Sequence, residues 1–597
     1  MAAIITEKFR LHNAKQFFES FNETGDNTSS SLDSTYYFFI GKSSSFIDAD
    51  NYGVENSVSD NVPPVPHDDV ASESYTWDSM IAAKRITSSD VTYAIPRRNW
   101  TNDTMYDMYE HDIRPAAGVD TVGNLTSTGV DSLWFSNYYF MTSEYKVYKI
   151  LENTGTNSDF KYLGTEPTST SYLPFFSDGG YLLKYMYTLS VEQIDKFLTS
   201  DFIPVKTDSD VSAQAVDGRI HVVRVTGGTG YTDGTYYTSI KGDGNGAVVK
   251  LFVSGGTIQP FGSGSTKTEV LDSGTTVLNT TGDGSTLAYT LSTSVTSTDF
   301  VQVIVNSLNI DSSQYTINGT SLTFTTAPAV GETIVVTLGN NVGYTYGYID
   351  LTDVYSDSSL TTPANIDQSN TGDGGNVDAV ISPRGGHGYD AVAELGGHFV
   401  MMNVKMTQSE GDDFTIANDF RQLGIVVDPY NWGTTTAATE STRRQSFAIK
   451  FGAAPTTDFI IDEKLTQSVT GAIGKVVDWD STNNILYYTQ ERHPNYGIDA
   501  NNNYVAFSGA NLITGSVSNA FETPSVTATE TITLPGGNDI IFTAGYCSPE
   551  LEPDSGSIIY FENRRPISRA ADQTEDIKIT IEFWWINISI ILLRLDN

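Results

Sequence analysis

The chain reads Val248-Val-Lys-Leu-Phe-Val-Ser-Gly-Gly-Thr-Ile258 in a region rich in valine, isoleucine, threonine and tyrosine. The β-branched and aromatic run favours a strand, and Gly255-Gly256 is a hairpin signal before the next apolar pair. Short runs of the same kind, separated by Gly, Asn and Asp, continue from Arg219 to about Thr439. This pattern predicts an all-β region in the middle of the chain.

Four strands within this region predict a compact β-sandwich. They are the runs 300–305, 315–317, 322–325 and 333–338, each rich in valine, isoleucine, threonine or phenylalanine. Asn318-Gly319 separates the second run from the third and predicts a tight hairpin there. Further along, the polar segment 480–484 predicts a turn between strands at 476–479 and 485–488.

The first 217 residues mix helices with strands. Apolar residues recur every three or four positions between Glu7 and Phe21, which predicts an amphipathic helix with an aromatic face. The run Ser34 to Ile40 predicts a buried strand. A second helix is expected around Trp77, Met80, Ile81 and Lys84, and a third after the capping box Ser190-Val-Glu-Gln193.

The fold class predicted from these patterns is mainly β with some α, in several domains. We expect an α+β and β-sandwich framework formed by the N- and C-terminal segments, with all-β sandwich modules inserted between them. The expected limits are 1–217 for the N-terminal framework, 218–265 for a β-hairpin linker module, 266–343 for the inserted sandwich, 344–440 for a β arm with a Gly/His loop, 441–545 for a second β domain, 546–583 for a segment returning to the framework and 584–597 for a C-terminal extension.

The charge excludes one class of function. The chain carries 72 acidic and 34 basic residues, a formal net charge of -38. A phosphate backbone would be repelled over most of such a surface, so no nucleic-acid partner is expected.

Neither a disulfide nor a membrane anchor is expected. The single cysteine, Cys547, has no partner for an intrachain disulfide or a thiolate zinc site, which fits folding in a reducing cytoplasm. The N-terminal residues become charged at Glu7, before an apolar signal segment could develop. The most apolar stretch, Trp584 to Leu593, is about half as long as a membrane-spanning helix requires.

The glycine-rich segments are interpreted as turns and not as phosphate sites. Gly41-Lys42-Ser43 lacks the upstream glycine of a phosphate-binding loop, because that position is Tyr36. The segments 227–230 and 242–246 lack the strand-then-helix context of a dinucleotide site.

One loop is the best metal candidate in the chain. It begins at Pro383-Arg384, contains His387 and Asp390, and continues through Glu394 to His398. The two histidines are eleven residues apart, a spacing that presets no ligand geometry. The alternative is an ordered loop in which Arg384 and His387 donate hydrogen bonds to backbone carbonyls at an interface. No metal, cofactor or catalytic residue is predicted, because neither a nucleophile elbow nor a defined carboxylate pair can be recognised.

Two ends of the chain carry an ordered set of motifs. The N-terminal set is Ile5-Thr-Glu-Lys-Phe-Arg10, Phe39-Ile-Gly-Lys42, Pro63-Pro-Val-Pro-His-Asp68 and Ala94-Ile-Pro-Arg-Arg-Asn-Trp100; the C-terminal set is Gly556-Ser-Ile-Ile-Tyr-Phe-Glu-Asn-Arg-Arg-Pro566, Asp572-Gln-Thr-Glu575 and 577–583. Together these segments resemble the baseplate wedge protein of T-even-like contractile-tailed bacteriophages, of the gene product eight type. The middle of the chain resembles β modules in tail proteins of marine T-even-like phages.

The resemblance implies a structural virion protein of the tail baseplate, assembled in the host cytoplasm, and not an enzyme. It implies a homodimer in each wedge that contacts subunits resembling gene products ten, seven and six and rearranges when the sheath contracts. Two alternatives are a tail fibre or receptor-binding protein, and a tail-associated polysaccharide depolymerase. Fibres usually show repeats or heptads, which this sequence lacks.

Interface or framework positions are expected at two pairs of arginines and in the Gly/His loop. They are Arg97, Arg98, Trp100, Arg384, His387, His398, Arg564 and Arg565. Pro96 and Pro566 stiffen the segments that carry the two arginine pairs. The arginines either pair with the chain's own carboxylates or clamp a partner subunit. The resembled family has an aspartate where this chain has Asn99.

The last fourteen residues have no counterpart in the resembled family. Isoleucines at 586, 588 and 590 alternate with polar residues, which predicts an extra strand. This strand either pairs with a neighbouring subunit or covers the chain's own sheet.

Overall fold

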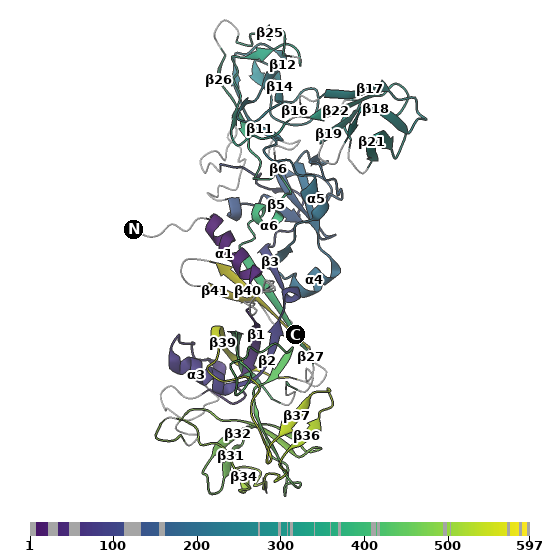
Figure 1. Ribbon diagram of the computed structural model, residues 1–597. Helices are drawn as coiled ribbons and strands as arrows, with labels where there is room; N and C mark the ends of the chain where they lie inside the picture. Colours follow the sequence, from purple (N-terminus) through teal and green to yellow (C-terminus); the bar gives the residue numbers. More distant parts are fainter. Residues whose placement is uncertain are drawn as a thin grey trace. The chain divides into compact units, whose positions relative to one another are not determined.

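The protein is described here from a computed structural model. It describes residues 7–21, 34–46, 60–112, 133–153, 161–272, 275–295, 300–306, 308–310, 314–339, 341–358, 360–367, 372–407, 413–414, 418–493, 498–501, 503–569, 574–583 and 588–593. Antiparallel sheets dominate these residues, and the helices are few and short, so the predicted mainly β, multidomain fold class is confirmed (Figure 1).

The chain divides into two compact units. The first consists of residues 1–11 and 93–398, and the second of residues 12–92 and 399–597. Both units therefore combine segments that are far apart in the sequence. The domain limits expected from the sequence stay a prediction.

A five-stranded sheet lies at the centre of the second unit, and we call it the framework sheet. Its order is β29-β2-β1-β28-β39, and every neighbouring pair is antiparallel. The strands are β29 (Thr442–Arg444), β2 (Met80–Ile86), β1 (Tyr36–Gly41), β28 (Phe420–Val427) and β39 (Ser557–Ile567). Two strands from the N-terminal segment thus lie between strands from the C-terminal part of the chain.

Burial on both faces explains why β1 is almost entirely aromatic and aliphatic. All six of its residues are buried, and Phe39 pairs with Gly424 of β28. A Cβ atom at Gly424 would lie 2.5 Å from the Phe39 ring, so glycine is required for this close approach. The predicted strand at 34–40 is confirmed.

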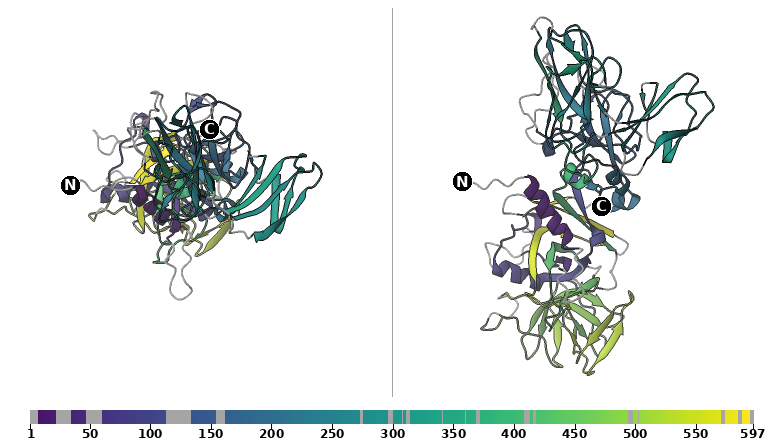
Figure 2. Two further views of the ribbon diagram at one scale, coloured as in Figure 1. Left: turned by 90° about the horizontal axis from the view of Figure 1, so that it is seen from above. Right: turned by 45° about the horizontal axis from the view of Figure 1, so that its top comes forward.

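Helix α1 (Glu7–Glu19) confirms the predicted N-terminal helix. Its aromatic face packs within the second unit, where Phe17 meets Tyr36 edge-on at 5.7 Å and lies tilted against Phe583 at the same centroid distance. Phe21, just beyond the helix, stacks on Tyr36 at 4.1 Å. Figure 2 shows the dark purple helix beside yellow C-terminal strands in its right view.

The second predicted helix is partly wrong. Helix α3 (Val70–Ser79) begins earlier, at the N-cap Asp69, whose side chain accepts a hydrogen bond from the Ser72 N–H at 2.8 Å. It ends at Ser79, and Met80 to Ile86 form strand β2. The apolar run that looked helical is buried on both faces of the framework sheet, where pairing with β1 and β29 overrides the local periodicity.

The second unit contains three further sheets. Strands β27 (Phe399–Thr407), β40 (Thr574–Phe583) and β41 (Ile588–Leu593) are antiparallel neighbours. A seven-stranded sheet has the order β35 (Phe521–Glu522), β34 (Ile513–Gly515), β31 (Lys464–Gln467), β32 (Ile473–Asp480), β33 (Ile485–Thr489), β30 (Phe447–Lys450) and β38 (Tyr546–Cys547). A hairpin joins β36 (Glu530–Thr533) to β37 (Asp539–Phe542).

Two predictions for these sheets are confirmed. The turn at 480–484 connects the paired strands β32 and β33. The C-terminal strand β41 pairs with β40, so it extends a sheet of its own chain. The tail residues 584–587 and 594–597 lie outside the described residues.

Several antiparallel sheets build the first unit outside residues 275–339. Strand β3 (Val91–Pro96) pairs with β10 (Phe202–Val205) through residues 93–96. A second sheet has the order β5 (Tyr139–Met141), β6 (Lys146–Glu152), β9 (Leu182–Thr188) and β8 (Phe175–Phe176), and β4 (Thr104–Met105) pairs with β7 (Lys161–Tyr162).

A third sheet of the first unit has the order β11 (Val222–Thr229), β26 (Asp373–Val380), β23 (Gly347–Tyr348) and β13 (Lys241–Gly242). The fourth has the order β15 (Thr257–Ile258), β14 (Ala247–Ser254), β12 (Gly234–Ser239), β24 (Val354–Tyr355) and β25 (Pro363–Ala364), with β16 (Glu269–Asp272) also paired to β14.

Short helices accompany these sheets. They are α4 (Val191–Phe197), α5 (Ser209–Ala213) and α6 (Ala391–Glu394). The Ser190/Gln193 capping box predicted for α4 is confirmed, with each side chain bonded to the other residue's backbone N–H. The Gly255-Gly256 hairpin is confirmed between β14 and β15.

The predicted sandwich forms from a contiguous stretch of the chain, and we call it the sandwich. One sheet has the order β17 (Thr275–Thr281), β22 (Thr333–Gly339), β19 (Phe300–Val305) and β20 (Leu308–Asn309), and the other pairs β18 (Ala288–Val295) with β21 (Tyr315–Phe324). Both sheets contribute to one apolar core, for example through Leu291 and Val303. The predicted hairpin at Asn318-Gly319 is wrong, because β21 runs through this dipeptide as one strand and pairs with β18. Gly319 adopts its left-handed conformation beside an irregularity of the β18/β21 register.

Candidate functional site: a buried ion-pair clasp in the second unit

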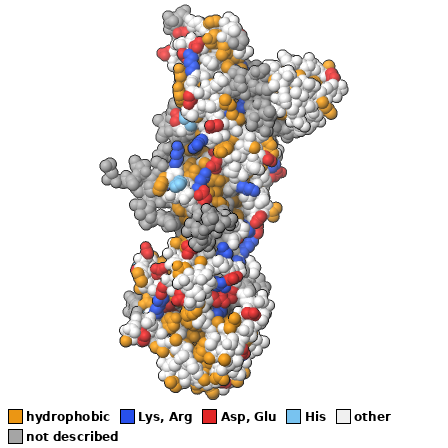
Figure 3. Space-filling model, viewed as in Figure 1, with side chains coloured by type: hydrophobic (Ala, Val, Ile, Leu, Met, Phe, Trp, Pro, Cys, Tyr) orange, Lys and Arg blue, Asp and Glu red, His pale blue; other side chains and the backbone are white. Residues whose placement is uncertain are grey.

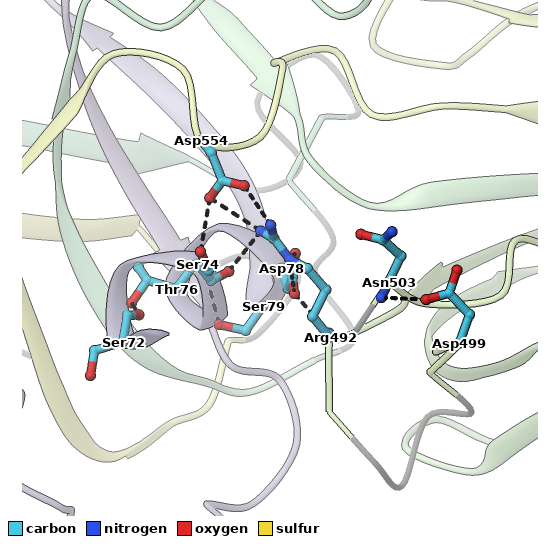
Figure 4. A network of polar contacts seen from close by, with 9 residues as sticks. All are labelled: Ser72, Ser74, Thr76, Asp78, Ser79, Arg492, Asp499, Asn503 and Asp554. Carbon is cyan, nitrogen blue, oxygen red and sulfur yellow. Dashed lines mark hydrogen bonds and ion pairs between the residues drawn. The ribbon is translucent and has the colours of Figure 1, made fainter. Parts of the chain in front are cut away.

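Arg492, which follows β33, forms ion pairs with two carboxylates of the second unit. Its Nε donates to both oxygens of Asp78 at the end of α3, at 3.1 and 2.9 Å. Its terminal nitrogens donate to Asp554, in the turn before β39, at 2.5 and 3.1 Å. One guanidinium therefore joins its own segment to two others, 414 and 62 residues away in the chain (Figure 4). We call Asp78, Arg492 and Asp554 the clasp.

Backbone contacts fix the clasp in place. The Arg492 N–H donates to Asp78 Oδ2 at 2.7 Å, and Arg492 Nη2 donates to the Ser74 carbonyl at 3.3 Å. The Ser74 hydroxyl donates to Asp554 Oδ1 at 3.2 Å. Helix α3 thus contacts both ends of the guanidinium, and its rotation about its own axis would break several hydrogen bonds at once.

The clasp is buried on one side. The Asp78 side chain is 2% exposed, whereas that of Asp554 is 43% exposed. Burial raises the pKa of Asp78 to about 6, although the Arg492 guanidinium opposes this effect. The carboxyl of Asp78 therefore depends on Arg492 to remain ionised near neutral pH.

A second ion pair lies next to the clasp. Lys42 follows β1 with a left-handed backbone, and its Nζ contacts Glu491 Oε1 at 3.0 Å, with both side chains less than 10% exposed. Since Glu491 precedes Arg492, two consecutive residues connect β1 and α3 to the seven-stranded sheet. The Gly41-Lys42-Ser43 segment is thus a structural connection between β1 and the segment after β33.

The arginines predicted near Trp100 belong to the first unit. Arg97 donates to the Thr199 carbonyl at 2.7 Å and to Asn99 Oδ1 at 3.0 Å. Arg98 donates to the Trp134 carbonyl at 3.2 Å and lies 4.5 Å above the Tyr139 ring. Both are half-buried, and each has a backbone carbonyl as an acceptor.

Trp100 itself is part of an aromatic core. Its ring meets the Tyr162 ring edge-on at 5.8 Å and packs beside the cluster around Phe140 and Tyr148. These contacts give Trp100 a packing role within the first unit.

Arg564 and Arg565 lie on β39, at the edge of the framework sheet. Arg564 pairs with Glu562 at 2.9 Å, and Arg565 donates to the Asn61 carbonyl at 3.0 Å. The neighbouring Asn563 donates to the Pro64 carbonyl at 2.9 Å. The proline-rich segment therefore covers part of this strand.

The Gly/His loop is divided between solvent and a buried charged cluster. Arg384 is exposed, whereas His387 and His398 are buried. His398 stacks on Trp134 at 4.7 Å, and its Nδ1 lies 2.7 Å from the Gly396 carbonyl oxygen. His387 Nδ1 lies 3.0 Å from Lys149 Nζ.

Lys149 is the centre of that cluster. Its Nζ contacts Glu394 Oε2 at 2.7 Å, with exposures of 0% and 2%, and lies 4.0 Å above the Tyr109 ring. Burial, together with the Lys149 charge, holds the pKa of His387 well below its usual range, so this histidine is neutral. Within the described residues no group of three or more His, Cys, Asp or Glu side chains is arranged to hold a metal ion. A lysine ammonium beside His387 also disfavours a cation at that nitrogen.

The sequence did not single out Asp78, Arg492 or Lys149. Lys149 left a signal, since a lone charge between Val147 and Leu151 in a strand indicates a buried ion pair. Asp78 and Arg492 gave no such signal in the sequence, because charged residues near turns and helix ends are common.

The family comparison is decisive for the N-terminal segment. Residues 3–139 match the family model Phage-Gp8, described as Bacteriophage T4, Gp8. The predicted resemblance to a gene product eight type baseplate protein is thereby confirmed, and the match supports a structural role in a phage baseplate in general. The matched segment contains α1, β1, α3 and β2, and so contributes both Lys42 and Asp78.

The other comparisons add less. A search of curated proteins gave no match. Within the described part of the chain, every helix is too short or too polar to cross a membrane.

Proposed function

We propose that this chain is a wedge subunit of a phage baseplate that holds neighbouring subunits in register. The observation that supports this proposal is the composition of the framework sheet. Strands of the Gp8-matched segment pair with β28, and β28 pairs with β39, which carries the second resembling motif set. Parts of both family-like ends of the chain thus build one sheet.

The ion pairs support a mechanical role. Arg492 and Glu491 connect the framework sheet to the seven-stranded sheet. The side chains of their ion pairs are buried or half-buried. Breaking such pairs one at a time is costly, so we propose that the second unit moves as a rigid element when the baseplate rearranges before contraction. We propose no catalytic step and no cofactor.

The proposed partners are a second copy of the chain and the wedge subunits that resemble gene products ten, seven and six. A decisive experiment is imaging of an intact tail at subunit resolution, combined with the mass of the purified chain in solution. We expect two copies per wedge and a dimer in solution. A trimer located in a fibre, or release of reducing ends from host polysaccharide by the purified chain, would overturn the proposal in favour of a fibre protein or a depolymerase.

A further inference from the structure

Two buried lysines of the first unit lie directly opposite each other. Lys149 of β6 and Lys184 of β9 are cross-strand partners in these antiparallel strands, and they are 0% and 2% exposed. Side chains in such a pair share one face of the sheet, with Cβ atoms about 5 Å apart, and like charges there are destabilising. His221 and His387 lie beside them, and we call these four residues the lysine–histidine cluster.

One carboxylate serves both lysines. Glu394 Oε2 lies 2.7 Å from Lys149 Nζ, and Glu394 Oε1 accepts a hydrogen bond from the Gly388 N–H at 2.7 Å. Lys184 Nζ instead donates a hydrogen bond to the backbone carbonyl of Tyr172. Within the described residues, Glu394 is the one carboxylate whose charge acts on Lys184. The two ammonium groups therefore face a single negative charge.

The excess positive charge persists at neutral pH. Burial lowers the pKa of Lys184 to about 8, and the Glu394 charge opposes this effect, so the ammonium group remains mostly protonated near pH 7. On the face of the molecule seen in Figure 3, acidic side chains lie among the basic ones. In the lysine–histidine cluster this compensation is incomplete, and a buried charge without a counter-charge is costly. An anion bound there would remove that cost.

The histidines connect the cluster with solvent and offer donors to an anion. His387 Nδ1 lies 3.0 Å from Lys149 Nζ, and because an ammonium group only donates, Nδ1 accepts this hydrogen bond and Nε2 carries the ring proton. The His221 ring lies 5.7 Å from the His387 ring and is half-buried. Burial, followed by the charges of Arg219 and Lys184, holds the pKa of His221 well below its usual range. His221 is therefore neutral and keeps one N–H group as a donor.

The backbone of the Gly/His loop lets Lys184 approach closely. A Cβ atom at Gly388 would lie 2.8 Å from Lys184 Cε and 3.4 Å from its Nζ, and Gly388 has a left-handed φ of 94°. A residue with a side chain is therefore disfavoured at this position. The ammonium group thus lies against the residue that follows His387 in the chain.

We propose that the lysine–histidine cluster is a binding site for a small oxyanion of the phosphate type. The Lys184 ammonium and the imidazole N–H groups are donors, and an oxyanion presents several acceptor oxygens to them at once. The bound charge offsets the excess of the two ammonium groups over the Glu394 carboxylate. This inference goes beyond the proposed wedge function, because it concerns a structural ligand of the first unit.

The first test is thermal unfolding of the purified full-length chain at pH 7, in about 10 mM sodium phosphate and in sodium chloride of equal ionic strength. We expect phosphate to raise the unfolding temperature of the first unit by about 2–4 °C, because a ligand that binds only the folded state stabilises it. Lys184→Met should abolish this rise, since Glu394 alone then balances Lys149.

The matched control is Lys250→Met. Lys250 is another mostly buried lysine of the first unit, with a side chain that is 11% exposed, but its Nζ lies 2.5 Å from Glu269 Oε2. Because this lysine already has a carboxylate of its own, the control variant should keep the full phosphate-dependent rise.

A second readout uses the unmodified chain and does not depend on the folding of a variant. The titration of His221 is followed by NMR of the histidine-labelled chain, with and without phosphate. A bound anion opposes the neighbouring cations, so the pKa of His221 should rise by about one pH unit in phosphate and not in chloride.

Three results would overturn the inference. If phosphate changes neither the unfolding temperature nor the His221 titration of the unmodified chain, the cluster binds no oxyanion. If chloride has the same effect as phosphate, the effect is general screening by salt. If Lys184→Met keeps the full rise, phosphate binds elsewhere on the chain. None of these results bears on the proposed wedge function.

Discussion

The framework sheet and the sandwich are both antiparallel β structures, but they are assembled in opposite ways. The sandwich takes all its strands from residues 275–339, so its core closes over short loops. The framework sheet takes strands from residues as far apart as Tyr36 and Ile567. Its formation therefore requires distant segments to meet, and the buried ion pair Lys42–Glu491 joins β1 to the segment after β33. This difference predicts that a destabilising substitution in the sandwich lowers the stability of the sandwich alone, whereas one in the framework sheet lowers the stability of the whole second unit.

The largest expected effect comes from a matched pair of phenylalanines. Phe39→Ala in β1 and Phe324→Ala in β21 remove the same ring from sites that are 0% and 4% exposed. Each should cost about 3–5 kcal/mol of local stability. We expect Phe39→Ala to lower the unfolding temperature of the whole second unit, and Phe324→Ala to accelerate hydrogen exchange only within 275–339. If both variants accelerated hydrogen exchange over equally large parts of the chain, the comparison would be contradicted.

The second effect concerns the clasp. Arg492→Met leaves the Asp78 carboxyl buried without its guanidinium, and we expect a loss of roughly 2–3 kcal/mol near pH 8, measured by chemical unfolding. The loss should shrink near pH 5, because Asp78 is then protonated and no longer needs a counter-charge.

The control for the clasp is Arg564→Met. This residue forms an ion pair with Glu562 on the same strand, with both side chains about one quarter exposed, so the loss should stay below about 1 kcal/mol. A loss in Arg492→Met that is no larger than in this control would refute the clasp.

The third effect is a gain of stability. Asp413 is buried, and burial together with the Glu550 charge raises its pKa to about 6. Because the folded-state pKa is raised, the contribution of this group to stability is present at low pH and is lost as the pH rises through about 6. Thr442 and Asn538 both donate hydrogen bonds to Asp413 Oδ2. An amide oxygen at the same place can accept both of these hydrogen bonds.

Asp413→Asn should therefore stabilise the second unit by about 1–2 kcal/mol at pH 7.5 and by almost nothing near pH 4.5. Unfolding midpoints at the two pH values measure the difference. A gain that does not change with pH would show that the charge of Asp413 is not its cause.

The smallest effect is expected at Gly319 in the sandwich. Its φ of 62° strains any residue with a Cβ, although the nearest atom to that Cβ would be 3.7 Å away. Gly319→Ala should therefore cost about 1 kcal/mol through backbone strain alone, visible as faster hydrogen exchange in β18 and β21. Gly452→Ala is the control, because Gly452 has an ordinary φ and similar space around it. It should leave exchange unchanged.

The sequence by itself determined the local elements of this protein. The helix at Glu7–Glu19, the aromatic strand β1, the capped helix α4 and most strands of the sandwich follow from periodicity, capping and turn residues, all of which act over a few positions. The N-terminal motif set also sufficed to recognise the resemblance to the gene product eight type, which the match over 3–139 confirms. The resemblance of the C-terminal set stays a prediction.

Only the tertiary structure decided which distant segments meet. Residues Met80–Ile86 carry a helical apolar spacing but form a strand, because β1 and β29 offer backbone partners on both sides. The continuous strand β21 likewise forms because β18 pairs along it, despite the Asn318-Gly319 signal. Asp78, Arg492 and Asp554 could not be grouped from the sequence, since charged residues carry no periodic signal and their pairing depends on three-dimensional proximity. Local propensity acts over a few residues, whereas ion pairs and sheet order depend on distances that only the folded chain defines.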